Sequence, residues 1–230
     1  MTAKELKKYR EAAGLTQQGA SKLLGVSQTY LSLLENGDRP VTPELEKRAA
    51  NVFRLAPTML PSLASHYRVA RVNDDQLTAD LSALGYPGFS HYKPAARRKN
   101  PADVLLSALN ADQRDARLME AMPWLALKFY EMDWRTLMDT AKLHDLQNRL
   151  GFVTGVALGM AQLRGKTAAA KKLKRTETRL QHSRLDREDT LCNEKMTNAE
   201  RRWLTTNRSD EAKYWHMLTS LSPKLVRYVD

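Results

Sequence analysis

The chain of 230 residues is long enough for one or two domains with a sizeable core. Its 37 Lys and Arg residues against 26 Asp and Glu residues give a formal net charge of +11, so the expected partner is a polyanion. A single cysteine, Cys192, excludes an internal disulfide framework and a cysteine-based zinc site. The longest mostly apolar run, residues 150–161, is too short to span a bilayer, so we expect no membrane partner.

The N-terminus predicts a charged amphipathic helix over residues 3–12, which Gly14 is expected to end. This stretch has no apolar core and no cleavage site, which is unlike a signal peptide. We therefore expect a cytoplasmic protein.

Two short helices at a tight corner are predicted over residues 15–36. Thr16 is a good N-cap for the first helix, because its hydroxyl can accept from an otherwise unpaired backbone N–H of the first turn. Gly25 supplies the permissive backbone that a sharp turn after this helix requires. Ser27 then caps the second helix, whose leucines form an apolar face.

The opposite face of the second helix carries Gln28, Thr29 and Ser32. These uncharged side chains both donate and accept hydrogen bonds, as the reading of base edges in a major groove requires. The geometry is that of a helix-turn-helix whose second helix reads the DNA. The alternative is an ordinary pair of antiparallel helices that never meets DNA.

Residues 4–60 resemble the Cro and phage-repressor type of DNA-binding domain. The matching positions are Leu6, Arg10, Ala13, Gly14, Leu15, Thr16, Gln17, Gln18, Ala20, Leu24, Gly25, Val26, Ser27, Leu31, Leu34, Glu35, Asn36 and Gly37. One departure is Gly19, because members of that family often carry Glu or Gln there and close a capping box with Thr16. A glycine at this position weakens the helix by about 1 kcal/mol relative to alanine.

The resemblance implies a DNA-binding surface and an internal ion pair between Arg10 and Glu35. The implied DNA-binding residues are Gln17, Gln18, Ser27, Gln28, Thr29, Tyr30, Ser32, Asn36 and Arg39. Among them, Gln17, Asn36 and Arg39 would contact the phosphate backbone, and the outer face of the second helix would contact bases. A homodimer would then bind a palindromic operator in double-stranded DNA.

After this motif, Thr42 is predicted to cap a helix whose first residue is Pro43, and a last short helical segment is predicted between Pro57 and Pro61. The sequence therefore predicts a five-helix DNA-binding domain over residues 1–65. Residues 66–100 are predicted to form a connector with one short helix that ends at Gly85. The basic residues of the connector are His91, Lys93, Arg97, Arg98 and Lys99. They belong either to a solvated linker or to an arm that touches DNA backbone.

Residues 101–230 are predicted to form a separate α-helical C-terminal domain that dimerises or binds a partner. We expect a helix break near Pro123 and a central helix over residues 143–163. Three glycines four residues apart lie on one face of that helix, Gly151, Gly155 and Gly159, so another backbone can approach closely. The approaching segment is either a helix of the same chain or a second subunit.

Basic side chains crowd residues 164–187 and leave only a thin apolar stripe of Ala169, Leu173 and Leu180. This segment is a solvated spacer, a second DNA contact or a contact for an acidic protein groove. The remaining tail is rich in large apolar residues, so we expect it to fold back on residues 101–163 or to bind another protein. The whole chain is predicted to be all-α.

The sequence contains no pattern that is typical of an enzyme or a metal site. It has no HExxH, no GxSxG and no phosphate-binding loop, and its five histidines are scattered. Acidic neighbours of Cys192 do not favour a thiolate. We therefore expect no catalytic residues, no metal and no cofactor.

Two functional hypotheses follow. The first is a sequence-specific transcriptional repressor. The second is an antitoxin that also represses its own operon, because residues 124–134 and 145–152 resemble part of regulators encoded beside nucleotidyltransferase-like toxins. In that case residues 101–230 would bind a co-encoded toxin. The alternative is a plain repressor whose C-terminal domain dimerises or senses a small ligand.

Overall fold

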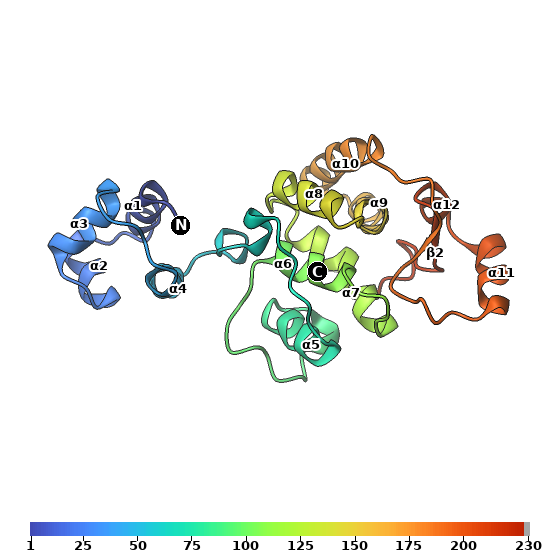
Figure 1. Ribbon diagram of the computed structural model, residues 1–230, viewed down its shortest axis with the longest axis horizontal. Helices are drawn as coiled ribbons and strands as arrows, with labels where there is room; N and C mark the ends of the chain where they lie inside the picture. Colours follow the sequence, from blue (N-terminus) through green and yellow to red (C-terminus); the bar gives the residue numbers. More distant parts are fainter. Residues whose placement is uncertain (228–230) are drawn as a thin grey trace. The chain divides into compact units, whose positions relative to one another are not determined.

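The computed structural model describes residues 1–227 of the chain. The chain forms two compact units, Met1–Pro61 and the residues from Ser62 onward, and each is described by itself below (Figure 1). The predicted all-α fold is confirmed, since helices make up both units. In the described residues, the strands are limited to β1 (Asp189–Thr190) and β2 (Met217–Leu218), which pair in parallel.

Local sequence signals set the helix boundaries of the N-terminal unit. Its elements are α1 (Ala3–Ala12), α2 (Gln17–Leu24), α3 (Gln28–Asn36), α4 (Pro43–Val52) and the 3₁₀ turn η1 (Pro57–Met59). Each α-helix is preceded by a hydroxyl that accepts from the backbone N–H three residues later, at Thr2, Thr16, Ser27 and Thr42. Gly25 has a φ of +67° and ends α2 in the left-handed region that glycine tolerates best.

The core of the N-terminal unit is made of small and aliphatic side chains from all four α-helices, together with the ring of Phe53 at the end of α4. Its fully buried members include Leu6, Ala20, Leu24, Leu31, Leu34 and Ala49. Through them α1 packs on α3, while α2 packs on both α3 and α4. The predicted five helical segments of this domain are therefore all present, the last of them as a 3₁₀ turn.

The C-terminal unit is larger and is organised around one long helix. Its elements are the 3₁₀ turns η2 (Leu63–His66) and η3 (Pro87–Phe89) and the α-helices α5 (Asp74–Ala83), α6 (Pro101–Leu109), α7 (Ala116–Lys128), α8 (Trp134–Leu143), α9 (Gln147–Leu163), α10 (Thr167–Gln181), α11 (Asn198–Asn207) and α12 (Asp210–Tyr214). Helix α9 is buried along almost its whole length, between α7 and α10. This position explains its apolar, glycine-rich composition.

Residues 66–100, expected as a connector, lie within the C-terminal unit. Leu77 and Leu81 of α5 are fully buried in its core. The Tyr86 ring meets the Trp124 ring of α7 edge to face, with centroids 5.1 Å apart. Burial of this kind requires a packed segment, so the structure places the boundary between units at Pro61.

Helix α7 corrects one expectation. The predicted break near Pro123 is wrong, because α7 runs unbroken from Ala116 to Lys128 with Pro123 inside it. Proline removes one intrahelical hydrogen bond, which normally kinks or ends a helix. Here Pro123 and its neighbours Met122 and Trp124 are all buried, and their packing offsets this loss.

The glycine face of α9 is covered by the tail of the same chain. A methyl group at Gly151 would overlap the ring of Trp215, which is fully buried. At Gly159, a Cβ atom would lie 2.6 Å from Cγ of Pro223. Of the two predicted occupants, the structure therefore shows the same chain, although the contact is made by an aromatic ring and a proline rather than by a helix.

Candidate nucleic-acid interface

The corner between α2 and α3 is held by backbone and side-chain hydrogen bonds. After Gly25, the Val26 N–H donates to the Ser21 carbonyl oxygen at 3.0 Å. Arg48 of α4 donates through Nη1 to the Leu24 carbonyl oxygen at 2.7 Å and so satisfies the end of α2. Both bonds fix the direction in which α3 leaves the turn.

Helix α3 turns an apolar face inward and a polar face outward. Its inner residues, Leu31, Leu34 and Glu35, are buried. On the outer face, Gln28 and Thr29 are exposed, and their side chains make no hydrogen bond within residues 1–227. These amide and hydroxyl groups are therefore available to an external partner.

The other predicted contact residues occupy different environments on the N-terminal unit. Gln18, Ser27, Tyr30, Asn36 and Arg39 are exposed, whereas Gln17 and Ser32 are partly buried. The Ser27 hydroxyl is already engaged, since it accepts from the Tyr30 N–H at 3.1 Å. These residues lie on α2, on α3 and in the segments at the two ends of α3.

Asn36 borders a hollow that is lined on one side by lysines. The hollow lies between α1 and the end of α3, and its basic residues are Lys4, Lys7 and Lys8. All three lysines are exposed. Glu11 also lines the hollow and is exposed, so three exposed positive charges stand against one exposed negative charge, and a phosphate group that contacts Asn36 would meet a net positive charge there.

Gln17 differs from its expected role because its side chain faces inward. Its Nε2 donates to Oε2 of Glu35 at 2.9 Å. Glu35 also accepts from Arg10, whose Nε and Nη2 lie 2.6 and 3.0 Å from its two oxygens. The expected Arg10–Glu35 pair is thus confirmed, and Gln17 completes it.

The environment of Glu35 favours its charged form. Burial alone would raise the pKa of this carboxyl, but the hydrogen bonds from Arg10 and Gln17 outweigh burial, and the pKa lies below its ordinary value. The hydrogen bond to Glu35 in turn raises the pKa of Arg10. This ion pair ties α1 to the inner face of α3, so it positions the helix that carries Gln28.

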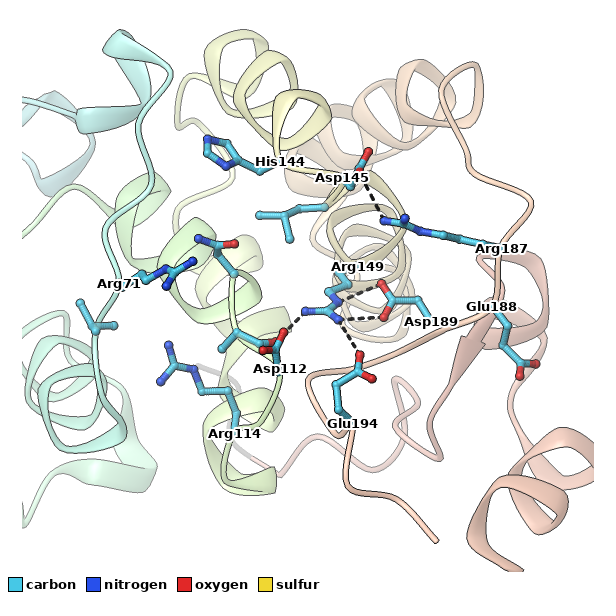
Figure 2. A pocket seen from close by; sticks show the side chains of 14 residues that line it. Arg71, Asp112, Arg114, His144, Asp145, Arg149, Arg187, Glu188, Asp189 and Glu194 are labelled. Atoms are coloured by element: carbon cyan, nitrogen blue, oxygen red, sulfur yellow. Dashed lines mark hydrogen bonds and ion pairs between the residues drawn. The ribbon is translucent and has the colours of Figure 1, made fainter. Parts of the chain in front are cut away.

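The C-terminal unit contains an open, highly charged pocket of about 570 Å³ (Figure 2). Its charged lining residues are Arg71, Asp112, Arg114, Asp145, Arg149, Arg187, Glu188, Asp189 and Glu194. Arg114 and Arg149 are buried and already paired, with Asp74 and Asp189 respectively. Arg71 and Asp112 are exposed, and their side chains have no partner in the part of the chain that the structure describes.

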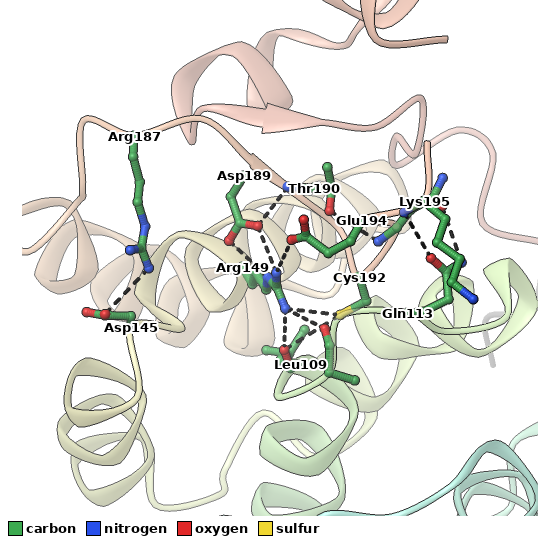
Figure 3. Close-up of polar contacts among 12 residues, drawn as sticks. Leu109, Gln113, Asp145, Arg149, Arg187, Asp189, Thr190, Cys192, Glu194 and Lys195 are labelled. Carbon is green, nitrogen blue, oxygen red and sulfur yellow. Dashed lines mark hydrogen bonds and ion pairs between the residues drawn. The ribbon is translucent and has the colours of Figure 1, made fainter. Parts of the chain in front are cut away.

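Arg149 is the centre of the hydrogen-bond network beside this pocket (Figure 3). Its Nε and Nη2 donate to both oxygens of Asp189, at 2.9 and 2.8 Å. Its Nη1 donates to the carbonyl oxygens of Leu109 and Ala111, at 2.9 and 2.7 Å. One side chain therefore joins α9 to the end of α6 and to β1. Sequence reasoning missed this residue, although an arginine at the start of an otherwise apolar helix was a signal for it.

Cys192 lies against the same arginine, 3.5 Å from its Nη1. Burial raises the pKa of the Cys192 thiol to about 11, and Arg149 opposes this rise only in part. The thiol is therefore protonated and inert at neutral pH, as its acidic neighbours in the sequence indicated.

Helix α10 docks on α9 through one narrow face and exposes the rest. Ala169, Leu173 and Leu180, the predicted apolar stripe, are buried. The basic residues Lys171, Lys172, Lys174, Arg175 and Arg179 are exposed. The predicted split between an apolar stripe and a basic remainder is confirmed.

Comparison with known proteins identifies the N-terminal unit. Residues 3–63 match the family described as a helix-turn-helix domain. The searches of curated proteins and of solved structures find no match for this chain. Together with the geometry of α2 and α3, the match shows that the N-terminal unit is a helix-turn-helix DNA-binding domain, the class found in DNA-binding regulators.

Within residues 1–227, no helix has both the length and the apolar character needed to cross a bilayer. The same residues hold no cluster of three or more His, Cys, Asp or Glu side chains arranged to bind a metal ion.

Proposed function

We propose that this protein is a sequence-specific transcriptional repressor whose helix α3 reads base edges in the major groove. The observation that carries the proposal is the outer face of α3, where Gln28 and Thr29 are exposed and free of internal hydrogen bonds. Their amide and hydroxyl groups match the donor and acceptor pattern of base edges. The buried residues beneath them hold the helix rigidly, which specific reading requires.

The remaining residues of the surface would position α3 rather than select a sequence. Asn36 and Arg39, both exposed at the end of α3, suit contacts to phosphates. Gln17 can take this role only through the second N–H of its Nε2, because the first is donated to Glu35 and its side-chain oxygen, like a phosphate oxygen, can only accept. A homodimer would place two copies of α3 about 34 Å apart, one turn of DNA, on a palindromic operator.

The decisive test is Gln28→Ala, measured against a duplex selected from random sequences with the wild-type protein. We expect this variant to lose about 1–3 kcal/mol of affinity for the preferred duplex and to discriminate less at one base position. Gln162→Ala is a matched control, because Gln162 is an exposed glutamine in the C-terminal unit. An equal loss on all sequences would assign Gln28 to the backbone instead of the bases.

A second candidate function is that of an antitoxin, which would combine autorepression with binding of a co-encoded toxin. The residues that carry this resemblance, 124–134 and 145–152, lie largely in the core, so they cannot themselves form the toxin-binding surface. The observation that favours a protein partner is an apolar groove of about 370 Å³ near the chain's end. Leu225 lines it and is 58% exposed, and on α11 Trp203 is 57% exposed.

Co-expression with the adjoining open reading frame tests the antitoxin function. We expect a stable complex and rescue of growth, and both should be lost in Trp203→Glu and Leu225→Glu. Gln28→Ala should keep the complex while it weakens repression. If the chain purifies alone and the neighbouring product is harmless, the protein is a plain repressor. The charged pocket lined by Arg71 and Asp112 would then be the place to look for a small ligand, by thermal shift with metabolites.

A further inference from the structure

We propose that the outer face of α10 is a second DNA-binding surface, which contacts the phosphate backbone of duplex DNA through Lys171, Lys172, Arg175 and Arg179. This inference rests on the proposed DNA-binding function. It goes beyond that function because it assigns part of the affinity to the C-terminal unit.

The four cations share one side of the helix. With 3.6 residues per turn, Lys171, Arg175 and Arg179 form a row that repeats about every 6 Å, and Lys172 lies beside it. The opposite side of α10, which includes Leu173 and Leu180, is buried against α9. Docking of the apolar side therefore forces the basic row toward solvent.

The charges in this row are not neutralised within the protein. In residues 1–227, none of the four side chains makes a hydrogen bond or an ion pair, whereas the neighbouring Lys174 contacts Glu177 at 3.0 Å. Like charges three or four residues apart destabilise a helix by their repulsion. Alternating signs of charge are typical of a solvated helix face, whereas this row carries positive charge alone, as segments that bind nucleic acid often do.

The distribution of charge along the chain points to the same surface. Residues 1–61 contain nine Lys and Arg residues against six Asp and Glu residues. Residues 164–187 contain nine against only two, in a much shorter segment. The electrostatic part of DNA binding scales with the number of phosphates that are neutralised. The helix-turn-helix domain is therefore weakly basic, and the strongest cationic segment lies in the other unit.

The chemistry of the exposed face favours DNA over an acidic protein. Besides its cations, this face offers only small side chains such as Ala168 and Thr178. Stable protein interfaces need a buried apolar or aromatic centre, which is absent from the exposed part of α10. Phosphate binding needs no such centre. Because the helix-turn-helix domain is linked to this unit, its binding to DNA would raise the local concentration of phosphates around α10.

The salt dependence of DNA binding tests this proposal. The test variant carries Lys171→Gln, Lys172→Gln, Arg175→Gln and Arg179→Gln, since glutamine keeps the helix propensity of lysine and arginine. The control variant carries Arg117→Gln, Arg135→Gln, Lys195→Gln and Arg202→Gln, which removes the same charge from scattered exposed positions of the same unit. Fluorescence anisotropy would give the affinity of each for a 30-base-pair duplex between roughly 50 and 200 mM KCl, the range over which phosphate contacts dominate.

We expect the slope of log K against log [salt] to become shallower by about 3–4 in the test variant, since each phosphate contact contributes about 0.9. Between 50 and 200 mM salt, wild type should thus lose about 100-fold more affinity than the test variant. The control should keep the wild-type slope. Equal slopes for all three proteins would overturn the assignment of α10 as a DNA-binding surface. In that case, sequence-selective binding by the wild-type protein would still support the proposed function. Failure of wild type to bind any duplex would overturn both.

A crosslinking experiment provides a second readout that does not depend on net charge. Because the thiol of Cys192 is buried and protonated, a new surface cysteine can be labelled selectively. Arg175→Cys with an azidophenacyl label should crosslink to the duplex, whereas Arg135→Cys with the same label should not. Equal crosslinking from both positions would overturn the assignment to α10. Circular dichroism would confirm that each variant is folded.

Discussion

Each unit of this protein contains a buried arginine that binds a carboxylate, but the two ion pairs differ in their burial and in the segments that they connect. Arg10 meets Glu35, whose side chain is fully buried and has Gln17 as its other hydrogen-bond donor, so the Glu35 charge is balanced mainly by Arg10. Arg149 meets Asp189, which keeps some contact with solvent, and it also binds two backbone carbonyl oxygens. The first pair joins two helices, whereas the second joins helix α9 to strand β1.

This difference predicts how much stability each unit loses when its arginine is replaced. A fully buried carboxylate that loses its only cation is left uncompensated, which costs more than the pair itself contributes. Loss of Arg149 should cost less, because its carbonyl partners are neutral and the carboxylate of Asp189 is partly exposed and can be hydrated. The N-terminal unit should therefore be the more sensitive to loss of its arginine.

Arg10→Met has the largest expected effect. It leaves Glu35 buried without its main partner, so we expect the N-terminal unit to lose about 3–5 kcal/mol of stability. All four tryptophans lie beyond residue 61, so tryptophan fluorescence reports only the C-terminal unit. Helicity by far-UV circular dichroism and DNA binding should fall, while the fluorescence transition stays unchanged. Arg39→Met, at an exposed position, is the control for helicity, and equal losses from the two variants would contradict the role of the ion pair.

Acid should produce a weaker form of the same effect. The pKa of Glu35 is lowered in the folded state, so its contribution is complete above the ordinary carboxyl pKa of 4.5 and is lost as the pH falls through the lowered value. The N-terminal unit, followed by its helicity, should therefore unfold at a lower temperature as the pH drops below about 4.5. In Glu35→Gln this particular pH dependence should disappear. If the unfolding temperature of Glu35→Gln depends on pH in the same way as that of the wild-type protein, another carboxylate is responsible for the pH dependence.

Gly151→Ala tests the long-range packing of the C-terminal unit. The added methyl group would overlap the ring of Trp215, so we expect a loss of about 1–3 kcal/mol despite the better helix propensity of alanine. At Gly155, on the same helix, an added methyl group would lie 3.1 Å from Oε1 of Glu177, at the flexible end of that side chain. Gly155→Ala should therefore reduce stability less than Gly151→Ala. Trp215→Leu should reduce the penalty of Gly151→Ala in a double-mutant cycle. If the two alanine variants behave alike, Trp215 does not fill the glycine face in solution.

The sequence predicted most of the N-terminal unit because its signals are local. Thr16, Gly25 and Ser27 lie within a turn of the boundaries that they determine, so their chemistry alone places α2 and α3. Even so, the direction of the Gln17 side chain depends on Glu35, which is 18 residues away, whereas the family resemblance implied a phosphate contact for Gln17.

The C-terminal unit was harder to predict because its decisive contacts join distant residues. Periodicity revealed the glycine face of α9, but nothing local indicated that Trp215 fills it. The partner of Arg149 lies 40 residues away, in the two-residue strand β1, which is too short to show a periodic pattern. Pro123 shows the converse case, in which a strong local breaking signal was overridden by burial.

The basic loop of residues 91–99 offers the smallest predicted effect and separates its two interpretations. Lys99 contacts Asp80 at 2.6 Å, and the Asp80 side chain is 2% exposed, whereas the Lys99 side chain is 40% exposed. The loop is also fastened to α5 by the Ala95 N–H, which donates to the Ala79 carbonyl oxygen. Because water partly screens the ion pair and Gln76 also donates to Asp80, we expect Lys99→Gln to cost only about 1 kcal/mol.

Lys93→Gln is the matched control for this loop, since Lys93 is exposed and its side chain has no partner among residues 1–227. Its effect on the unfolding of the C-terminal unit, followed by tryptophan fluorescence in urea, should be negligible. If the loop is a solvated linker, Lys93→Gln also leaves DNA affinity unchanged. A uniform loss of affinity across all duplex sequences would instead identify the loop as a backbone-binding arm, because phosphate contacts carry no sequence information. Unfolding and DNA affinity, measured together, then distinguish Lys99, which stabilises the fold, from a lysine such as Lys93, which would act only by binding DNA.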